Sequence, residues 1–341
     1  MNQDYQSQYP SIVISATDPD LPEKLPEGFS KYSNFEVMVQ SGKNTLYSCW
    51  DGIVGRTVAL KILAREYSMI EEERRRFLRE ARITAQLQHP NTVPVYDIGR
   101  NDVGAVYFTM KKIAGENFFK VLQRLSWSDK FTERRFPMSR LIDIVLQSCH
   151  ALSFAHLHGV IHRDVKPENI WVGTFGEVTL LDWGVAKVWG RGEISPSTEG
   201  PFKPGNVRGV YKEVESLTRS GQRPGTPLYM SPEQITGARV IDERTDLYSM
   251  GVVLYELLTF SEPFRGRTVE ETFEQILHDE PEPPHVRAGK RKVHPLLEEI
   301  TLRAIQKKPE DRYQKTSELI SDLVEAQRLI LGEEAEAGSS N

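Results

Sequence analysis

The chain has 341 residues, 39% of them hydrophobic and 27% charged, with a formal net charge of -5 at pH 7. This composition is that of a soluble globular protein with one large domain or two of ordinary size. No apolar stretch approaches the roughly 20 residues of a transmembrane helix, so we expect no membrane segment, and the negative charge disfavours nucleic acid as the main partner.

The N-terminus and the cysteines indicate a cytoplasmic protein. The first residues are polar and lack the basic-then-apolar order of a signal peptide. Cys49 and Cys149 show neither the spacing of metal ligands nor the pattern of a disulfide framework. We therefore expect two buried thiols in a reducing compartment.

Residues 1–30 are predicted to form a flexible tail, because four prolines interrupt any periodic pattern there. From Phe35 onward, short apolar and mixed runs alternate with glycine and charged turns, which is typical of an antiparallel meander. Five of these runs are predicted to be strands: residues 35–39, 45–50, 57–63, 93–98 and 105–110.

Lys61 lies in the third of these runs, at an alternation point where its stem can pack while its ammonium reaches towards a cleft. Taken alone, it would be interpreted as a surface lysine. The helix that follows is predicted to begin at Ser68, which forms a capping-box pattern with Glu71. Glu80 stands on the packing face of this helix and needs a partner, because burying an unpaired carboxylate is costly.

The rest of the chain is predicted to be mainly helical. Residues 122–137 are interpreted as a loop or an insertion. A strongly apolar helix over residues 138–158 ends at Gly159. Residues 246–260 are apolar around the whole circumference, as in a helix buried at the centre of a domain. Three further helices are predicted: residues 268–278, 296–306 and 316–331.

A dense polar run lies between two short apolar runs, residues 159–161 and 170–172. Its side chains include candidates for binding and catalysis: His162, Arg163, Asp164, Lys166 and Asn169. Polar residues between strand-like flanks belong to a loop that a sheet holds in place, which is how catalytic groups are usually presented. The next strand-like run ends in Asp-Trp-Gly at residues 182–184, so a second carboxylate is brought beside the loop.

These residues resemble the eukaryotic-type (Hanks-type) serine/threonine protein kinases, and most of all the bacterial members. The shared features are His-Arg-Asp, a lysine two positions after the aspartate, an asparagine five positions after it, and Asp-aromatic-Gly after a hairpin. A lone His-Arg-Asp would be interpreted as a solvated loop, but the whole run together with its partner motif favours function. The resemblance covers residues 33–328.

The resemblance implies an α+β, bilobal protein-kinase-like fold. A small antiparallel β-sheet lobe with one regulatory helix is expected beside a larger, mainly helical lobe. The expected parts are a flexible N-terminal tail (1–30), the small lobe (31–112), the large lobe (113–328) with its long activation segment (182–233), and an acidic flexible tail (329–341).

The resemblance also implies roles for four polar residues. Asp164 is expected to be the base, or the group that orients the accepting hydroxyl, and Lys166 the cation beside the transferred phosphate. Asn169 and Asp182 are expected to bind Mg²⁺, with Mn²⁺ as the other candidate. A few hard oxygen ligands suit such a cation, which keeps water and phosphate oxygens in its shell.

For ATP, the resemblance implies that Lys61 and Glu80 form the ion pair that holds the α- and β-phosphates. Met110 is expected to be the gatekeeper behind the adenine, although an ordinary core methionine would be equally buried, and residues 111–115 are expected to be the hinge. The other expected nucleotide contacts are Val39, Gly42, Leu46, Ala59 and Ile113.

The glycine-rich loop of the family is largely missing. Val39, Ser41 and Asn44 occupy the three glycine positions, with only Gly42 nearby. Glycines in this loop let the backbone approach the phosphates in conformations that other residues resist. We therefore expect ATP binding to be weakened but not abolished.

Residues 182–233 form a segment of about fifty residues, well above the usual connection length, so it is either functional or disordered. Its end, from Gly-Thr-Pro to Pro-Glu, resembles the substrate-docking end of serine/threonine kinases, and Lys166 and Thr226 favour serine or threonine over tyrosine as the acceptor. Autophosphorylation is expected at one or more of three residues: Ser216, Thr218 and Ser220.

A phosphate on this segment is expected to bind a cationic pocket formed by Arg163 and Lys187. The alternative for Arg163 is a structural role as a hydrogen-bond donor. The resemblance also implies two structural ties: Asp246 should hold the backbone of the catalytic loop, and Arg312 should pair with Glu233.

Three functions remain open. The first is an active serine/threonine protein kinase acting on ATP and protein substrates, with self-association for autophosphorylation. A pseudokinase scaffold with weakened ATP binding would explain the missing glycines, but it would usually also lack Lys61, Asp164 or Asp182, and none is lost. A small-molecule phosphotransferase of the same fold would lack the docking end of the activation segment. The sequence therefore favours the protein kinase.

Overall fold

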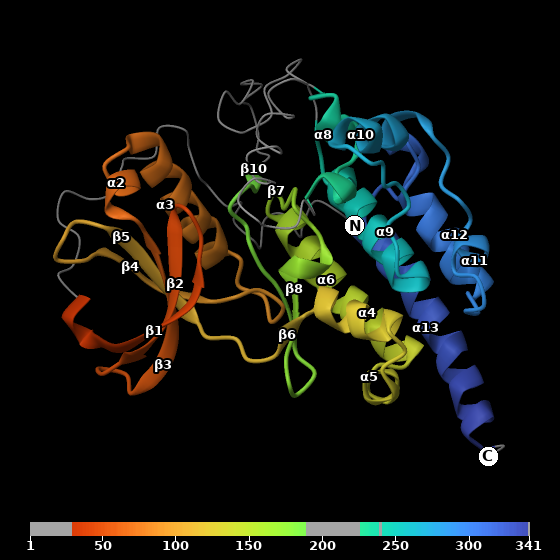
Figure 1. Ribbon diagram of the computed structural model, residues 1–341, viewed down its shortest axis with the longest axis horizontal. Coiled ribbons are helices and arrows are strands. Elements are labelled where there is room, and N and C mark those ends of the chain that lie inside the picture. The colour runs from red at the N-terminus through yellow and green to blue at the C-terminus, as the bar shows by residue number, and fades with distance from the viewer. Residues whose placement is uncertain (1–28, 189–225, 239–240, 340–341) are drawn as a thin grey trace.

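A computed structural model of the protein describes residues 29–188, 226–238 and 241–339. Figure 1 shows two lobes side by side, a smaller one built on a β-sheet and a larger one built of helices. The α+β bilobal fold predicted from the sequence is confirmed. Within the described part of the chain, no helix combines the length and the apolar character needed to cross a membrane.

The small lobe is organised by an antiparallel sheet with the strand order β1-β2-β3-β5-β4. A short 3-10 turn, η1, precedes it. These elements are η1 (Phe29–Lys31), β1 (Tyr32–Gln40), β2 (Asn44–Asp51), β3 (Arg56–Leu63), β4 (Val95–Arg100) and β5 (Val106–Lys111). Lys61 lies on the central strand, with Leu46 of β2 and Phe108 of β5 opposite it. Its backbone is therefore hydrogen-bonded into strands on both sides.

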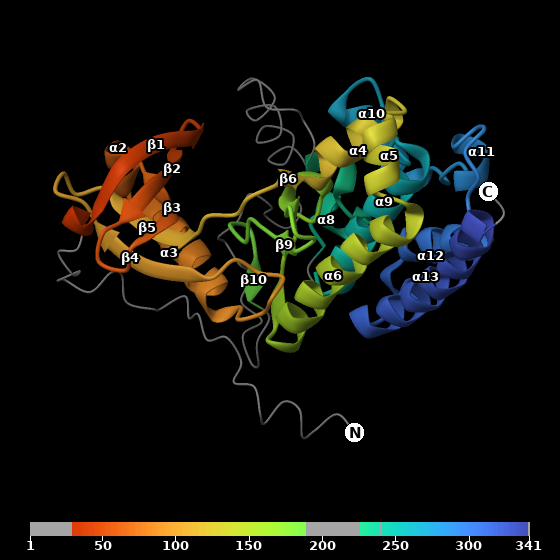
Figure 2. The ribbon, with the colours of Figure 1, turned by 90° about the horizontal axis from the view of Figure 1, so that it is seen from below.

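A long helix, α3 (Glu71–Gln86), packs against this sheet (Figure 2). Phe77, Leu78 and Ala81 recur at helical spacing and share a buried cluster with Phe108 of β5. Glu80 stands between these packing positions on the same helix. The sheet and α3 thus bring Glu80 and Lys61 to the same side of the lobe.

The predicted start of this helix is wrong. Ser68 is the last residue of a short helix, α2 (Arg65–Ser68), and α3 follows Ile70 without a side-chain cap. The Ser68 hydroxyl donates to Leu63 O (3.0 Å) and accepts from Val106 N (3.1 Å). This hydroxyl therefore joins the ends of two strands, and the expected capping box does not form.

The described part of the large lobe is mainly helical. Its helices are α4 (Phe118–Ser126), α5 (Lys130–Arg135), α6 (Met138–Leu157), α8 (Pro232–Ile235), α9 (Arg244–Thr259), α10 (Val269–His278), α11 (Pro284–Arg287), α12 (Pro295–Ala304) and α13 (Thr316–Ser339), with 3-10 turns η2 (Pro167–Asn169), η3 (Thr226–Tyr229) and η4 (Pro309–Asp311). Short strands form two small sheets, β6-β8-β9 and β10-β7. Their bounds are β6 (Glu116–Asn117), β7 (Val160–Ile161), β8 (Ile170–Val172), β9 (Val178–Leu180) and β10 (Lys187–Val188).

The centre of the large lobe is α9, in which every residue from Thr245 to Leu258 is buried. The helices α6 and α12 pack against it. Hydrophobic residues occur on all sides of this helix because other elements surround it. The prediction of a centrally buried helix at this position is confirmed.

Residues 122–137 are mostly helical, so the loop, one of the two interpretations of this stretch, is wrong. They contain the end of α4 and the whole of α5. The Asp129 carboxylate caps α5 by accepting hydrogen bonds from Phe131 N (2.9 Å) and Thr132 N (3.1 Å), and Arg124 of α4 donates to Thr132 Oγ1 (3.0 Å). Helices this short give too few apolar positions for a periodic signal.

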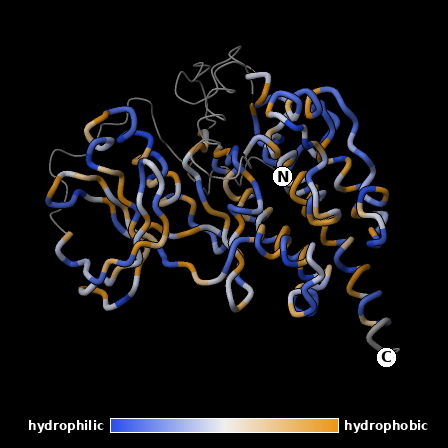
Figure 3. Tube along the Cα trace, in the orientation of Figure 1, coloured by the Kyte–Doolittle hydropathy of each residue, from blue (hydrophilic) through white to orange (hydrophobic). Residues whose placement is uncertain are grey.

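The last helix, α13, is longer than the sequence predicts. It packs against α6, and its buried apolar residues are spaced by three and four positions: Leu319, Leu323, Ala326 and Ile330. Hydrophobic and hydrophilic residues alternate along this C-terminal helix in Figure 3. Where a flexible tail is expected from residue 329, the helix continues to Ser339. Glu334 in this part accepts hydrogen bonds from N (3.3 Å) and Oγ (2.6 Å) of Ser139 in α6. Its neighbours are glutamate and alanine, which are strong helix formers.

The residue that follows the central helix α9 has a strained backbone. Phe260 has a φ of 58°, in the left-handed region that favours glycine. Arg291 covers its ring, with 4.1 Å between the guanidinium carbon and the ring centroid, and donates a hydrogen bond to Leu258 O (3.0 Å). The arginine therefore caps the helix and holds the ring above the strained backbone.

Replacing Phe260 separates the strain from the packing. Phe260→Ala removes the ring but keeps a Cβ at positive φ, whereas Phe260→Gly removes both. We expect the glycine variant to be more stable than the alanine variant by about 1 kcal/mol. Thermal unfolding followed by circular dichroism measures the order of the two melting temperatures. An alanine variant at least as stable as the glycine variant would show that residue 260 is not left-handed in solution.

Candidate active site

A single buried carboxylate holds the backbone of the loop that begins at His162. Asp246, in the first turn of α9, accepts hydrogen bonds from His162 N and Arg163 N, both at 2.8 Å. Its Oδ2 also lies 2.7 Å from Nε2 of His156, near the end of α6. Burial alone would raise the pKa of Asp246, but His156 and these donors hold it below its usual value. The predicted tie is present, and His156 is a partner that the sequence did not reveal.

Arg163 follows with an unusual backbone conformation, a φ of 70°. Its N–H is bound by Asp246, and its carbonyl oxygen accepts a hydrogen bond from Nε2 of Gln234 in α8 (3.0 Å). Because it is held on both sides, Arg163 can keep a conformation that costs a non-glycine residue free energy. The loop is therefore fixed before any substrate arrives. Nothing in the local sequence marks Gln234 for this contact.

His162 connects this loop to the segment that carries the second carboxylate. Its Nδ1 accepts a hydrogen bond from Asp164 N (3.2 Å), and its Nε2 lies 2.9 Å from Leu181 O. A carbonyl oxygen can only accept, so Nε2 is the donor in this contact. The buried ring also packs on Trp183, with 4.5 Å between centroids. His162 thus places Asp164 beside the Asp-Trp-Gly turn.

The polar side chains of the loop converge on Asp164. Lys166 Nζ lies 2.6 Å from its Oδ2, and Asn169 Nδ2 donates to the same oxygen (3.0 Å) and to Asp164 O (2.8 Å). Burial raises the pKa of Asp164, against the lowering effect of Lys166. Burial would lower the pKa of Lys166, but Asp164 raises it above its usual value. The lysine therefore stays charged beside a carboxylate with enhanced proton affinity.

Asp182 supplies the second carboxylate from a left-handed residue, with a φ of 64°. Asp182 as a whole is exposed to solvent. Its carboxylate is nevertheless surrounded by protein atoms, and this loss of water alone would raise the pKa of Asp182. Lys61 and Lys166 outweigh this effect and hold the pKa of Asp182 below its usual value. At Gly184 a Cβ would lie 3.1 Å from Asp182 Oδ1 and 3.2 Å from Glu80 Oε2. A side chain at this position would therefore crowd two carboxylates.

Lys61 and Glu80 form the ion pair expected from the sequence, with 2.5 Å between Nζ and Oε1. Burial would lower the pKa of Lys61, but Glu80 and Asp182 raise it above its usual value. The ammonium of Lys61 is therefore charged and shared between two carboxylates. The pair also joins the central strand of the sheet to α3.

Comparison with known proteins decides the family. The sequence pattern of the family described as "Protein kinase domain" matches residues 40–327. The chain belongs to the protein kinase family. It is 32% identical over 303 residues to the serine/threonine-protein kinase PknD of Protochlamydia amoebophila, covering 88% of this chain and 30% of that protein. It is 33% identical over 299 residues to PknD of Chlamydia caviae, covering 86% and 31%. With the serine/threonine-protein kinase pkn3 of Myxococcus xanthus it shares 34% over 290 residues, covering 83% and 47%. The matched part of this kinase chain thus spans between 30% and 47% of the length of those bacterial relatives.

The residues expected around adenine lie on the small lobe of the kinase and on its connection to the large lobe. Ala59 of β3 is buried and stands opposite Met110 of β5, while Leu46, Met110 and Ile113 are half-buried. Gly115 at the end of the expected hinge has a φ of 112°, and a Cβ there would lie 2.1 Å from a backbone carbonyl oxygen. This glycine is required by the close approach of the hinge to the large lobe.

The loop that replaces the glycine-rich loop is a tight turn between β1 and β2. Val39 is 58% exposed. Ser41 N donates to Asn44 O (2.8 Å), and Asn44 N donates to Ser41 Oγ (3.2 Å). Gly42 does not have a positive φ, and a Cβ there would meet no atom within 4 Å, so the turn does not require glycine at this position.

The expected regulatory residues are only partly described. Ser216, Thr218 and Ser220 lie outside the described residues. Lys187 opens β10 and its backbone pairs with Ile161 of β7, and Thr226 is the first residue of η3. Burial lowers the pKa of the Arg163 side chain, Asp246 opposes this and Arg79 of α3 adds to it. Arg79 is a cation near Arg163 that the sequence did not reveal. The phosphate-binding role of Arg163 stays a prediction.

The segment that ends at Glu233 is fixed by the ion pair expected from the sequence. Arg312 donates to Oε1 (2.7 Å) and Oε2 (2.8 Å) of Glu233, with the arginine fully buried. Thr245 Oγ1 adds a third hydrogen bond to Glu233 at 2.7 Å. A bidentate pair of this kind fixes orientation as well as distance, so α8 is anchored to α9 and to the loop before α13.

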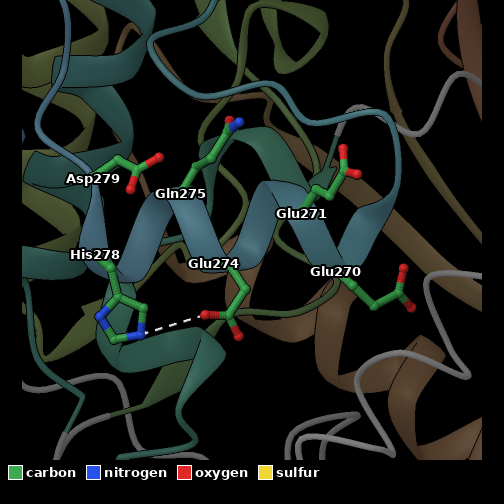
Figure 4. Close-up of a pocket in the computed structure, with 6 residues that line it drawn as sticks. All are labelled: Glu270, Glu271, Glu274, Gln275, His278 and Asp279. Atoms are coloured by element: carbon green, nitrogen blue, oxygen red, sulfur yellow. Dashed lines mark ion pairs between the residues drawn. The ribbon is translucent and has the colours of Figure 1, made fainter.

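A pocket of about 430 Å³ lies away from these groups, along α10. Figure 4 shows its side chains spread over the length of one helix, with an ion pair of 3.6 Å between Glu274 and His278. The lining residues are Glu270, Glu271, Glu274, Gln275, His278 and Asp279. None of the expected site residues is among them, and an acidic helix face of this kind is well explained by solvation alone.

Asp246 is predicted to be a stability residue. Asp246→Asn turns one acceptor oxygen into an NH₂ group that faces donors, so we expect a loss of about 3 kcal/mol in the free energy of unfolding at neutral pH. Asp164→Asn is the matched control. Its amide oxygen can still accept hydrogen bonds from Lys166 and Asn169, so this variant should change stability little. Urea unfolding measures both.

The difference in the free energy of unfolding between the parent and Asp246→Asn depends on pH. The pKa of Asp246 is lowered in the native protein, so its stabilising effect is complete above the ordinary pKa of about 4 and is lost as the pH falls towards the native value. The difference between parent and Asp246→Asn should therefore shrink below about pH 4. An Asn variant as stable as the parent at neutral pH would contradict this role.

Proposed function

We propose that this kinase transfers the γ-phosphate of ATP to serine and threonine hydroxyls of proteins. The observation that carries the proposal is the convergence of Lys166 and Asn169 on Asp164, next to a turn that presents Asp182. These groups match the needs of phosphoryl transfer: a base, a cation and oxygen ligands for a metal. The relatives named above as serine/threonine-protein kinases support the same acceptor.

In the proposed step, the hydroxyl oxygen of the substrate bonds to the γ-phosphorus while the bond from that phosphorus to the bridging oxygen of ADP breaks. Asp164 orients the hydroxyl and takes its proton, for which its raised pKa suits it. Lys166 keeps its proton and lies within 2.6 Å of that carboxylate, so its charge is close to the transferred group. Asp164 thus acts by position and as a base and Lys166 by its charge, and neither forms a covalent bond to the phosphoryl group.

Asn169 and Asp182 fit a hard divalent cation, with Mg²⁺ as our proposal and Mn²⁺ as the other candidate. The pKa of Asp182 is lowered, so its carboxylate is ionised. The hydrogen bonds of the Asn169 side chain described above come from Nδ2, which leaves Oδ1 as the atom suited to a metal. When bound, such an ion would offset the negative charge of the phosphates.

Lys61, oriented by Glu80, is proposed to hold the α- and β-phosphates, and Ala59, Leu46 and Met110 to surround the adenine. This assignment is supported by the charged state of Lys61 and by the register that sets Ala59 opposite Met110. Val39, Gly42 and Ile113 complete the proposed nucleotide contacts. Weaker binding than in a glycine-complete relative stays a prediction.

Protein substrates are proposed to dock at the segment ending in Glu233, with Lys166 and Thr226 favouring serine and threonine. We place this activity in the cytoplasm and propose no nucleic-acid partner. A pseudokinase scaffold is disfavoured, because Lys61, Asp164 and Asp182 are all present and assembled. Incubation of the purified chain with labelled ATP and Mg²⁺ tests the proposal directly.

Asp164→Asn and Asp182→Asn are predicted to abolish most activity without unfolding the protein. Each removes a charge used in the transition state, so we expect a fall in kcat of roughly 10³-fold or more, about 4 kcal/mol in the barrier, with a nearly unchanged melting temperature. Phosphate transfer to a protein acceptor and thermal unfolding are measured on the same samples. An Asp164→Asn protein with more than about a tenth of the parent activity would overturn the assignment of the base.

Autophosphorylation is predicted at one or more of Ser216, Thr218 and Ser220. Added phosphate should order the segment by pairing with cations, for which Arg163 and Lys187 are proposed. Mass spectrometry after incubation with ATP should find phosphate on this stretch in the parent and none in Asp164→Asn. Full activity after replacement of all three residues by alanine, or active protein with no modification between residues 188 and 223, would contradict the prediction.

A further inference from the structure

The turn that stands where the family has glycines is attached to α3. Lys43, the last residue before β2, points its ammonium at Glu73 in the first turn of that helix, with 2.6 Å between Nζ and Oε1. The same ammonium lies 5.5 Å from the ring centroid of Tyr67 in α2. The Lys43 carbonyl oxygen accepts a hydrogen bond from Ala64 N (2.9 Å). The backbone of Lys43 is thus held by the residue before α2, and its side chain by Glu73 of α3.

The turn itself is closed and has little freedom of its own. Ser41 and Asn44 bind each other through backbone and side-chain atoms, as described above, with a further bond from Ser41 Oγ to Asn44 O (2.9 Å). A glycine-rich loop reaches phosphates through backbone flexibility, and this turn lacks that property. Its position therefore depends on what it is attached to.

The attachment point is on the same helix as Glu80. Glu73 and Glu80 are seven residues apart, which is close to two helical turns, so they lie on one side of α3. Glu80 pairs with Lys61 at 2.5 Å, and Glu73 pairs with Lys43 at 2.6 Å. One helix is thereby joined at two points to the segments around the phosphate site.

We propose that Lys43 is a positioning residue for ATP, which acts by tethering the β1-β2 turn to α3 through Glu73. The tether substitutes for the adaptability of the missing glycines by holding a rigid turn at a fixed place beside the phosphates. A shift of α3 moves the turn and the Lys61 partner together, so nucleotide affinity follows the position of this helix. The inference depends on the proposed ATP-dependent function.

Two substitutions separate the tether from other roles of these residues. Lys43→Met keeps a stem that can pack on Tyr67 and removes the charge, and Glu73→Gln removes the partner charge without touching the turn. The Lys43 side chain is 47% exposed and that of Glu73 21%, and half-exposed ion pairs have modest strength. We therefore expect each variant to raise the Kd of a non-hydrolysable ATP analogue with Mg²⁺ by about two- to fivefold.

The double variant gives the sharpest result. Because both substitutions break one contact, Lys43→Met with Glu73→Gln should bind the analogue no more weakly than either single variant. The KM for ATP should rise in parallel with Kd, while kcat stays within about twofold of the parent. Lys43→Arg, which can keep the ion pair, should restore binding to near the parent value.

The matched control is a second ion pair on the same helix. Glu71 pairs with Arg75 at 2.6 Å and makes no contact with the turn among its described interactions. Glu71→Gln should leave Kd, KM and kcat unchanged while removing a charge of the same kind two residues away. Its melting temperature also provides the reference for any general effect on α3.

Several outcomes would overturn the tether. Additive effects of the two substitutions, or a Kd unchanged in Glu73→Gln, would show that Lys43 acts without Glu73, for example by contacting phosphate itself. An equal rise of Kd in Glu71→Gln would show that the effect comes from the total charge of α3 and not from the tether. Failure of the parent chain to bind the analogue at all would instead overturn the proposed function, so the two failures are distinguishable.

Discussion

The arrangement of the catalytic loop depends on one buried charge, the carboxylate of Asp246. Such a group is stable in the interior only if it is fully hydrogen-bonded, and its partners are the N–H groups of His162 and Arg163 and the ring of His156. The requirement works in both directions: the loop satisfies the carboxylate, and the carboxylate holds Arg163 in a left-handed conformation. The placement of Asp164 follows from this, because Asp164 N is bound by the ring of His162.

The small lobe has a related constraint at Lys61, whose ammonium is shared between carboxylates on separate elements. Lys61 on the central strand is flanked by Glu80 from α3 and Asp182 from the large lobe. The two lobes therefore meet electrostatically at one ammonium group. Neither lobe contains all of these charged groups, so their arrangement depends on elements of both lobes.

The sequence was sufficient to predict the parts of the fold and the candidate site that depend on one continuous run of residues or on a periodic pattern. Asp164 and Asn169 could be found because they belong to one continuous run, and α9 because apolar residues cover its whole circumference. It was insufficient where a side chain chooses between local and distant partners. Ser68 has the pattern of a helix cap but binds Val106, 38 residues away, and His156 reaches its carboxylate across 90 residues. Such choices are made by tertiary packing, which local propensity does not encode.

The buried tryptophan of the Asp-Trp-Gly turn gives this kinase an optical property. Of the four tryptophans in the described residues, Trp183 is 1% exposed, whereas Trp50 and Trp127 are 40% and 69% exposed and Trp171 is partly buried. Its ring lies against His162, directly after the carboxylate proposed to bind metal. Any rearrangement of this turn changes the surroundings of a shielded indole, and with them its fluorescence. Trp183 therefore makes the turn observable in solution by fluorescence, without a label.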